Sequence, residues 1–318
     1  MWFYQLLDSK FDNVSHEIKD EISYLGMVIT RIPGKGFKVS MEAYTKDILE
    51  FYGKDNLRNY ITPATADLFE QNEKKREPAA DKQKFHSTVA KILYMAKRTR
   101  GETLLATQIL CTRVKEPNIG DVQKLERVLG FLQMTKARKR WIDKSPMERV
   151  ICSIDAAFAC HTDGKSQSAC VLQLGDTVVQ ETCRKQKIVT KDPAEAELVA
   201  ASDHFVEAEL LCEFVEGQGY KMEKPILLLQ DNTAVIHLFE HGGGKPRTKH
   251  MRARVEMMKE KLAKKEYELR YCKTVEMLAD VLTKPLAGEA FQKLARRLLG
   301  MSPEPYHNRG ALREAEQQ

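Results

Sequence analysis

One sequence feature constrains the fold of this chain more than any other. It is the order of short β-rich segments and longer helical segments after Met147. Runs of β-branched and aromatic residues are typical of strands, and apolar residues spaced three and four apart are typical of helices. The expected strands are 149–158, 169–174, 177–183, 226–230 and 267–271, and the expected helices are 193–217, 232–241, 247–265 and 275–299. Three strands joined by short turns, followed by alternating helix and strand, predict an α/β fold with a five-stranded mixed sheet and flanking helices.

The first half of the chain has a different pattern and is expected to be mostly α-helical. Two β-rich runs around a Pro-Gly-Lys-Gly turn predict a hairpin over 24–40, and helical spacing predicts helices over 41–52, 85–98 and 121–134. A polar stretch over 70–81 predicts a flexible excursion. Turn formers and a proline in 141–147 mark a domain boundary, and a length of 318 residues favours two domains. We therefore expect domains at 1–145 and 146–300, and a disordered polar tail at 301–318.

Composition narrows the class of protein. The chain is 42% hydrophobic and 30% charged, and it contains no apolar run of the roughly 20 residues that a membrane span requires. Its first residues do not resemble a signal peptide, so we expect an intracellular protein that is not secreted. Seven cysteines without a CxxC pair favour reduced thiols over disulfides or structural zinc.

Positive charge is clustered rather than spread evenly. The net charge is +6, and lysines and arginines gather in 136–140, 244–254 and 259–265. Such clusters suit a polyanionic partner, although each one is equally compatible with a solvated helix face.

Four carboxylates stand where a sheet of this kind could bring them together. Asp155 interrupts an apolar strand, Asp231 ends another strand, Glu195 opens the long helix and Asp280 lies in the last expected helix. An Asp at a strand end more often caps a helix, but four acids converging on one site need a hard cation such as Mg²⁺ or Mn²⁺. Two such ions about 4 Å apart can activate water and hold a phosphodiester. Glu197 is the alternative to Glu195, because an error of two residues in the helix register exchanges them.

The motifs that contain these acids resemble the RNase H domain of the Pol polyprotein of copia-type (Pseudoviridae) long-terminal-repeat retrotransposons. The matching segments are SIDAAFACHTDGKSQSACVLQLG, CRKQKIVTKDPAEAELVAASD, QDNTAVI, RTKHMRARVEMMKEKL and VEMLADVLTKPL. The resemblance implies metal-binding roles for Asp155, for Glu195 as the first acid of AEAEL, for Asp231 and for Asp280. The chain departs from relatives at Ala157, at PAEAE and at RTRGET, and 271–280 lacks the histidine that cellular RNases H carry there.

The first half is similar to the part of the same polyprotein that follows the reverse-transcriptase active site. The segments YLGMVI, YITPAT, FHSTVAKILYMAKRTR and DVQKLERVLGFL carry this resemblance, which implies a palm-edge hairpin, a thumb and a connection. The polymerase motif, an aromatic residue followed by two aspartates, does not occur in this chain. We therefore do not expect it to polymerise DNA by itself.

The resulting hypothesis is a metal-dependent RNase H that cleaves the RNA strand of RNA–DNA hybrids with two Mg²⁺ or Mn²⁺ ions. The expected nucleic-acid contacts are Arg184, Lys185, Lys187, Asn232, Arg247, Lys249, His250 and Arg252. Other expected partners are the upstream reverse-transcriptase region or the integrase of the same polyprotein, in the cytoplasm, a virus-like particle or the nucleus, with no membrane. The alternative is a non-catalytic binding module that keeps the fold and the basic surface.

Overall fold

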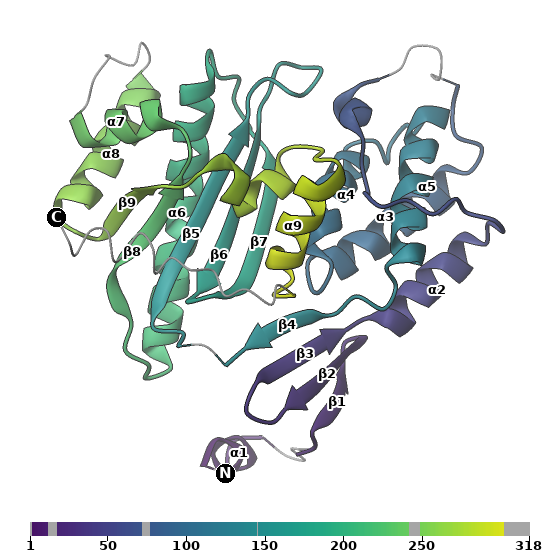
Figure 1. Ribbon diagram of the computed structural model, residues 1–318, viewed down its shortest axis with the longest axis horizontal. Helices are drawn as coiled ribbons and strands as arrows, with labels where there is room; N and C mark the ends of the chain where they lie inside the picture. Colours follow the sequence, from purple (N-terminus) through teal and green to yellow (C-terminus); the bar gives the residue numbers. More distant parts are fainter. Residues whose placement is uncertain (1, 12–17, 72–76, 145, 242–248, 302–318) are drawn as a thin grey trace.

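A five-stranded mixed sheet forms the centre of the second half of the molecule (Figure 1). The computed structural model describes residues 2–11, 18–71, 77–144, 146–241 and 249–301. The sheet has the order β7-β6-β5-β8-β9, and its strands are β5 (Arg149–Ala157), β6 (Gln167–Leu174), β7 (Thr177–Lys185), β8 (Glu223–Gln230) and β9 (Tyr267–Tyr271). The first three strands are antiparallel, and β8 and β9 run parallel to β5. The predicted fold class, a mixed α/β fold with this sheet, is confirmed.

The turn between β6 and β7 depends on glycine. Gly175 has φ +57°, and a side chain there would collide with the backbone oxygen of Pro146. Only glycine adopts this left-handed conformation without steric cost. The turn lets all eight residues of β6 lie buried in the middle of the antiparallel strands.

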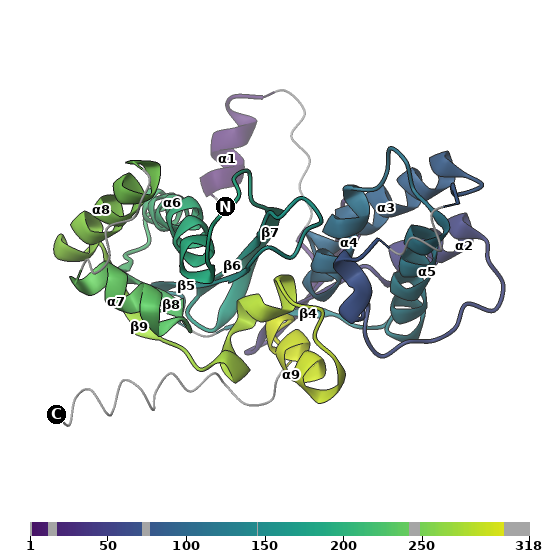
Figure 2. The same ribbon diagram turned by 90° about the horizontal axis from the view of Figure 1, so that it is seen from above.

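Three helices cover one face of the sheet. They are α6 (Pro193–Gly217), α7 (Thr233–His241) and α8 (Lys249–Ala263). Asp192 caps α6 by accepting a hydrogen bond from the backbone N–H of Glu195, and Pro193 occupies the first helical turn. Seen from above, α6 lies on the opposite side of the sheet from α9 (Figure 2).

The other face is covered by the C-terminal segment, which differs from the expected helix over 275–299. Two short 3₁₀ helices, η4 (Thr274–Glu276) and η5 (Leu278–Leu282), precede α9 (Gly288–Leu298). The expectation of one continuous helix was wrong because Met277 has an extended backbone between η4 and η5, and Pro285 disfavours helical geometry at Lys284 before α9. Asp280 therefore lies in a tight 3₁₀ turn rather than in an α-helix.

The N-terminal half contains a four-stranded sheet and a group of helices. Its strands are β1 (Glu21–Tyr24), β2 (Met27–Ile32), β3 (Gly36–Ser40) and β4 (Arg140–Asp143) in that order. The helices are α1 (Trp2–Asp8), α2 (Glu42–Tyr52), η1 (Ala66–Phe69), α3 (Lys82–Ala96), η3 (Gly101–Thr103), α4 (Leu104–Cys111) and α5 (Ile119–Met134). The predicted hairpin corresponds to β2 and β3, whereas β4 falls in the segment expected to be a boundary loop.

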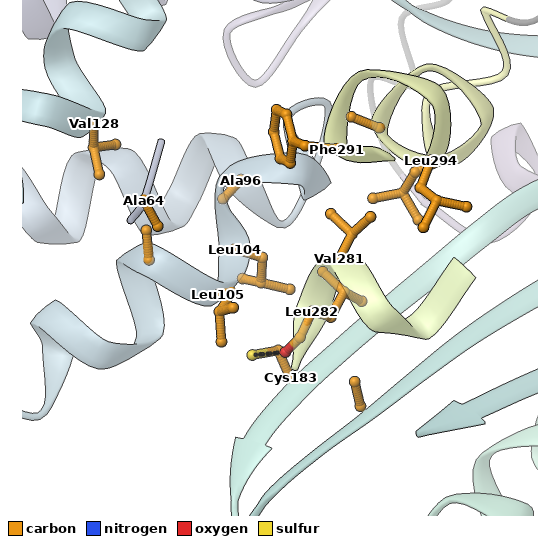
Figure 3. Packing of buried hydrophobic residues seen from close by; sticks show 14 of the residues in the cluster. Ala64, Ala96, Leu104, Leu105, Val128, Cys183, Val281, Leu282, Phe291 and Leu294 are labelled. Carbon is orange, nitrogen blue, oxygen red and sulfur yellow. Dashed lines mark hydrogen bonds between the residues drawn. The ribbon is translucent and has the colours of Figure 1, made fainter. Parts of the chain in front are cut away.

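One hydrophobic core joins the two halves across this segment. It contains buried residues from α3, α4 and α5 together with residues of β7, η5 and α9. Phe131 packs edge-on against Phe291 with ring centroids 5.8 Å apart. Cys183 donates a hydrogen bond from Sγ to the backbone oxygen of Leu282 across 3.1 Å (Figure 3). A second core lies between the sheet and α6, α7 and α8. The domain boundary near residue 145 stays a prediction.

Several expectations concern residues outside the described ranges. They are the disordered tail over 302–318, part of the flexible excursion (72–76) and the basic residues 244–248. Within the described ranges, no helix combines the length and the apolarity that a membrane crossing requires.

Candidate metal centre

Three carboxylates meet at one edge of the five-stranded sheet. Asp155 lies on β5, Asp231 directly follows β8, and Glu197 lies in the second turn of α6. One oxygen from each lies within 4.8 Å of the other two. The strand register explains why Asp155 and Asp231 are close. Ser153 lies beside Leu229 in the parallel strands, so Asp155 and Asp231, each two residues further along, come together at this edge.

Glu197, not Glu195, supplies the carboxylate from α6. Glu195 Oε2 accepts a hydrogen bond from the backbone N–H of Lys191 across 3.0 Å, so its side chain turns back along the chain and caps the helix. Glu197 is only 5% exposed and faces the sheet. Two residues advance a helix by about 200°, so the two side chains point in nearly opposite directions. The structure therefore corrects the expectation for Glu195.

This correction has a signal in the sequence. Asp192 followed by Pro193 marks the N-cap and the first helical position, which makes Glu195 the third residue of the helix. Glutamate at that position commonly returns its side chain to the start of the helix as part of a capping box. Glu197, two residues later, is then the glutamate available to the metal site.

Asp280 lies outside the group of three but is joined to it by Lys284. The ammonium group of Lys284 donates hydrogen bonds to Asp280 Oδ1 across 2.8 Å and to Asp155 Oδ1 across 3.2 Å. The hydroxyl group of Thr283 donates to the other oxygen of Asp155. Sequence reasoning identified both aspartates but missed these two donors.

Gln230 connects Glu197 and Asp231, two of the three carboxylates, through hydrogen bonds. It is 1% exposed, and its Nε2 donates to Glu197 Oε2 across 3.2 Å. Its Oε1 accepts hydrogen bonds from the backbone N–H groups of Asp231 and Asn232 across 2.8 and 2.9 Å. One side-chain amide thus connects the end of β8 to α6. The hydroxyl group of Thr274 donates to Asp231 Oδ2 across 2.9 Å.

Negative charge is concentrated here. Burial, and next the charge of Asp155, raise the pKa of Glu197 well above its usual range. The same two causes raise the pKa of Asp280 to about 7. Burial alone would lower the pKa of Lys284, but Asp155 and Asp280 outweigh it and raise that pKa. Carboxylates that repel one another in this way are typical of a site that takes a cation.

The donor set fits a hard divalent cation. Asp155, Glu197 and Asp231 each offer a carboxylate oxygen within reach of a common point, and Mg²⁺ and Mn²⁺ prefer such oxygen ligands. Gln230 and Thr274 orient two of the three carboxylates, as supporting residues do around metal ligands. Asp280 adds a fourth carboxylate beside Asp155.

The residues expected to contact nucleic acid are distributed over two regions. Arg184 and Lys185 lie on β7 and form ion pairs with Glu207 and Asp163, and Lys187 is exposed in the loop after β7. In the second region, Lys249, His250 and Arg252 are exposed on α8, and Arg247 lies outside the described residues. Asn232 Oδ1 accepts a hydrogen bond from the backbone N–H of Ala234 across 3.0 Å and so caps α7. Nucleic-acid contact by these residues stays a prediction.

The strand order and the carboxylates at one sheet edge define the class of fold as a mixed α/β fold with a candidate metal centre. Among solved structures, LC11-RNase H1, isolated from compost by a metagenomic approach, is 14% identical, with a TM-score of 0.34 over 46% of this chain and 97% of that chain. No protein-family model matches the chain.

The sequence is similar to retrotransposon polyproteins along almost its whole length. The retrovirus-related Pol polyprotein from transposon RE2 of Arabidopsis thaliana is 26% identical over 309 residues, which cover 96% of this chain and 21% of that protein. The Pol polyprotein from transposon RE1 of the same plant is 25% identical over 92% of this chain and 20% of that protein. The chain thus spans about a fifth of the length of these curated relatives. The resemblance to copia-type Pol polyproteins is confirmed.

Proposed function

We propose that this chain is a divalent-metal-dependent nuclease of the RNase H type, which cleaves the RNA strand of RNA–DNA hybrids. The observation that carries the proposal is the convergence of Asp155, Glu197 and Asp231 on one sheet edge, with oxygens within 4.8 Å of one another. Similarity to Pol polyproteins along the chain supports it. The chain is proposed to act beside the upstream reverse-transcriptase region or the integrase of such a polyprotein, in the cytoplasm, a virus-like particle or the nucleus.

The residues of the site divide into ligands and supports. Asp155, Glu197 and Asp231 would hold Mg²⁺ or Mn²⁺, and Asp280 would contribute beside Asp155. The bound metal would lower the pKa of water and neutralise charge on a phosphodiester. Gln230 keeps Glu197 turned toward this point. Hydrolysis then forms one phosphorus–oxygen bond to water and breaks the bond to the leaving oxygen, so no nucleophilic side chain is required.

Substrate binding is assigned to the exposed cations that flank the site. Lys187 follows β7, and Lys249 and Arg252 lie on the exposed side of α8. Cations of this kind contact phosphates independently of base sequence, and the shape and 2′-hydroxyl groups of a hybrid distinguish it from duplex DNA. Affinity for the hybrid is therefore expected to fall steeply with salt concentration.

A cleavage assay with a labelled RNA–DNA hybrid tests the proposal. The full chain should cut the RNA strand in Mg²⁺ or Mn²⁺ and leave duplex DNA intact. Asp231→Asn should reduce the rate by more than about 100-fold. Changing a residue that only supports a metal ligand can already lower activity by up to about 100-fold, and this variant removes a ligand itself. Asp47→Asn, an exposed aspartate on α2, is the matched control and should cut at the wild-type rate.

The possible outcomes separate the two functional classes. Cleavage by Asp231→Asn at the wild-type rate would show that the carboxylate site does not catalyse the reaction. Salt-sensitive binding of the hybrid without cleavage, by the wild-type chain and by Asp231→Asn alike, would show a nucleic-acid-binding module instead of an enzyme.

A further inference from the structure

A lysine side chain already occupies the space between two of the four carboxylates. Lys284 Nζ lies 2.8 Å from Asp280 Oδ1 and 3.2 Å from Asp155 Oδ1. Asp155 is 1% exposed and Asp280 is 3% exposed, so the ammonium group contacts two carboxylates that are almost completely shielded from water. The Lys284 side chain is 36% exposed, so these ion pairs join one half-buried cation to two buried carboxylates, and such charges interact more strongly than two fully exposed ones.

The backbone fixes this position. The N–H of Lys284 donates to the backbone oxygen of Asp280 across 2.9 Å, which closes one turn at the end of η5. Pro285 follows directly and prevents the chain from continuing as a helix. The lysine side chain is therefore anchored over Asp280 by the same turn that buries the aspartate.

The other two carboxylates are arranged differently. Glu197 and Asp231 accept hydrogen bonds from the uncharged groups of Gln230 and Thr274. Asp155 is shared: it contacts Lys284 through Oδ1 and Thr283 through Oδ2, and it also belongs to the group of three. A carboxylate has about four lone-pair positions, so Asp155 can accept both hydrogen bonds and still bind a metal.

We propose that Lys284 is a built-in cation that takes the place of a second metal ion. The chain then binds one divalent ion tightly, on Asp155, Glu197 and Asp231, while Lys284 neutralises Asp280 and the shared carboxylate of Asp155. This inference rests on the metal-binding part of the proposed function and is independent of the substrate. It departs from the two ions that the sequence alone led us to expect.

Counting bound Mn²⁺ on the full chain tests the proposal directly. Calorimetric titration, together with the electron paramagnetic resonance signal of free Mn²⁺, should show one ion per wild-type chain, bound at least ten-fold more tightly than any further ion. Lys284→Met and Lys284→Gln should each bind two ions with affinities within ten-fold of one another, because the space beside Asp280 then lacks its cation. Lys284→Arg should keep one. Lys293→Met, an exposed lysine on α9, is the matched control and should equal the wild type.

Thermal unfolding gives a second readout that does not depend on catalysis. Without divalent ions, Lys284→Gln should unfold at a lower temperature than the wild type, because two buried carboxylates lose their counter-charge. Mn²⁺ should raise its Tm by more than it raises the Tm of the wild type. A merely structural lysine would lower the Tm without changing the metal count.

Two results would overturn the inference. One is a wild-type chain that binds two Mn²⁺ ions with similar affinity, and the other is a Lys284→Gln variant with the metal count and affinities of the wild type. Failure of the proposed nuclease function can be distinguished from failure of this inference. The first would appear as absent cleavage of the hybrid, whereas the number of bound Mn²⁺ ions decides the role of Lys284 in either case.

Discussion

Gln230 Nε2 donates a hydrogen bond to Glu197 Oε2 across 3.2 Å, and this contact ties helix α6 to the end of β8 at the candidate metal centre. The oxygen of the same amide accepts the backbone N–H groups of Asp231 and Asn232. One buried side chain, 33 residues from Glu197 in sequence, thus sets the relative position of the carboxylates of Glu197 and Asp231. Positioning by a residue that does not itself touch the metal can be tested separately from ligation.

Gln230→Leu should weaken Mn²⁺ binding by about ten-fold, because Glu197 loses its donor and the backbone N–H groups that follow β8 lose their acceptor. Cleavage should fall in parallel at subsaturating Mn²⁺ and recover in part at high Mn²⁺. Isothermal titration and a rate profile against Mn²⁺ concentration measure both effects. Gln218→Leu, an exposed glutamine at the end of α6, provides the control. Unchanged Mn²⁺ affinity in Gln230→Leu would show that Glu197 is held by other contacts.

The two glutamates at the start of α6 offer a matched pair of variants. Glu197→Gln should reduce cleavage by more than about 100-fold and weaken Mn²⁺ binding, because it removes a ligand. Glu195→Gln should bind Mn²⁺ normally and lose about 1 kcal/mol of stability, because it weakens a helix cap. Cleavage, Mn²⁺ titration and urea unfolding are measured on both. The opposite assignment would follow if Glu195→Gln lost Mn²⁺ binding while Glu197→Gln kept it.

Much of the fold could be predicted from local patterns. The N-cap at Asp192 and the proline after it give the start of α6, and the glycine turn at Gly175 separates β6 from β7. Strand β4 could not be found in this way. Its partner in the sheet is β3, in which Val39 lies beside Arg140, about one hundred residues away. Pairing at such a distance leaves no periodic signal in the four residues of β4.

The candidate site was predictable where position in a strand decides the outcome. As expected, Asp155 lies within β5 and Asp231 directly follows β8, and the parallel register brings both to one sheet edge. The sequence led us to expect Glu195 as the ligand instead of Glu197, because both glutamates fit the motif. Only the capping hydrogen bond of Glu195 distinguishes them. Lys284 and Gln230 could not be identified from sequence, because their roles depend on which carboxylates the tertiary fold places beside them.

Stability in metal-free buffer should depend on pH through Asp280. Its pKa is raised from 3.8 to about 7 in the folded chain, so the folded state binds more protons than the unfolded state between these values. The free energy of unfolding should therefore fall as pH rises from about 4 to 7, by on the order of a few kcal/mol. Urea unfolding in a chelator across this range measures the slope.

Asp280→Asn should flatten this slope, since the amide does not titrate. Some slope should persist, because the raised pKa of Glu197 acts in the same direction. Mn²⁺ should stabilise the wild type most at high pH, where the carboxylates are ionised and free to bind it. Asp47→Asn serves as the control, and a slope in Asp280→Asn equal to that of the wild type would show that Asp280 does not titrate in this range.

A buried ion pair should make the two halves of the chain unfold together. Arg140 on β4 pairs with Glu181 on β7, and their side chains are 7% and 2% exposed. Burial raises the pKa of Glu181 despite the opposing charge of Arg140. Arg140→Met should therefore cost about 3–5 kcal/mol of stability, because it leaves Glu181 buried without a counter-charge.

The double variant Arg140→Met/Glu181→Leu should recover most of this loss, because two apolar side chains replace the pair. A double-mutant cycle by urea unfolding measures the coupling between the two residues. Lys264→Met, which breaks an exposed pair with Glu260 on α8, should have no measurable effect. Because the pair and the shared core of Phe131 and Phe291 connect the halves, the wild type should unfold in one transition. Two separate transitions, with Arg140→Met affecting only one, would instead support independent domains divided near residue 145.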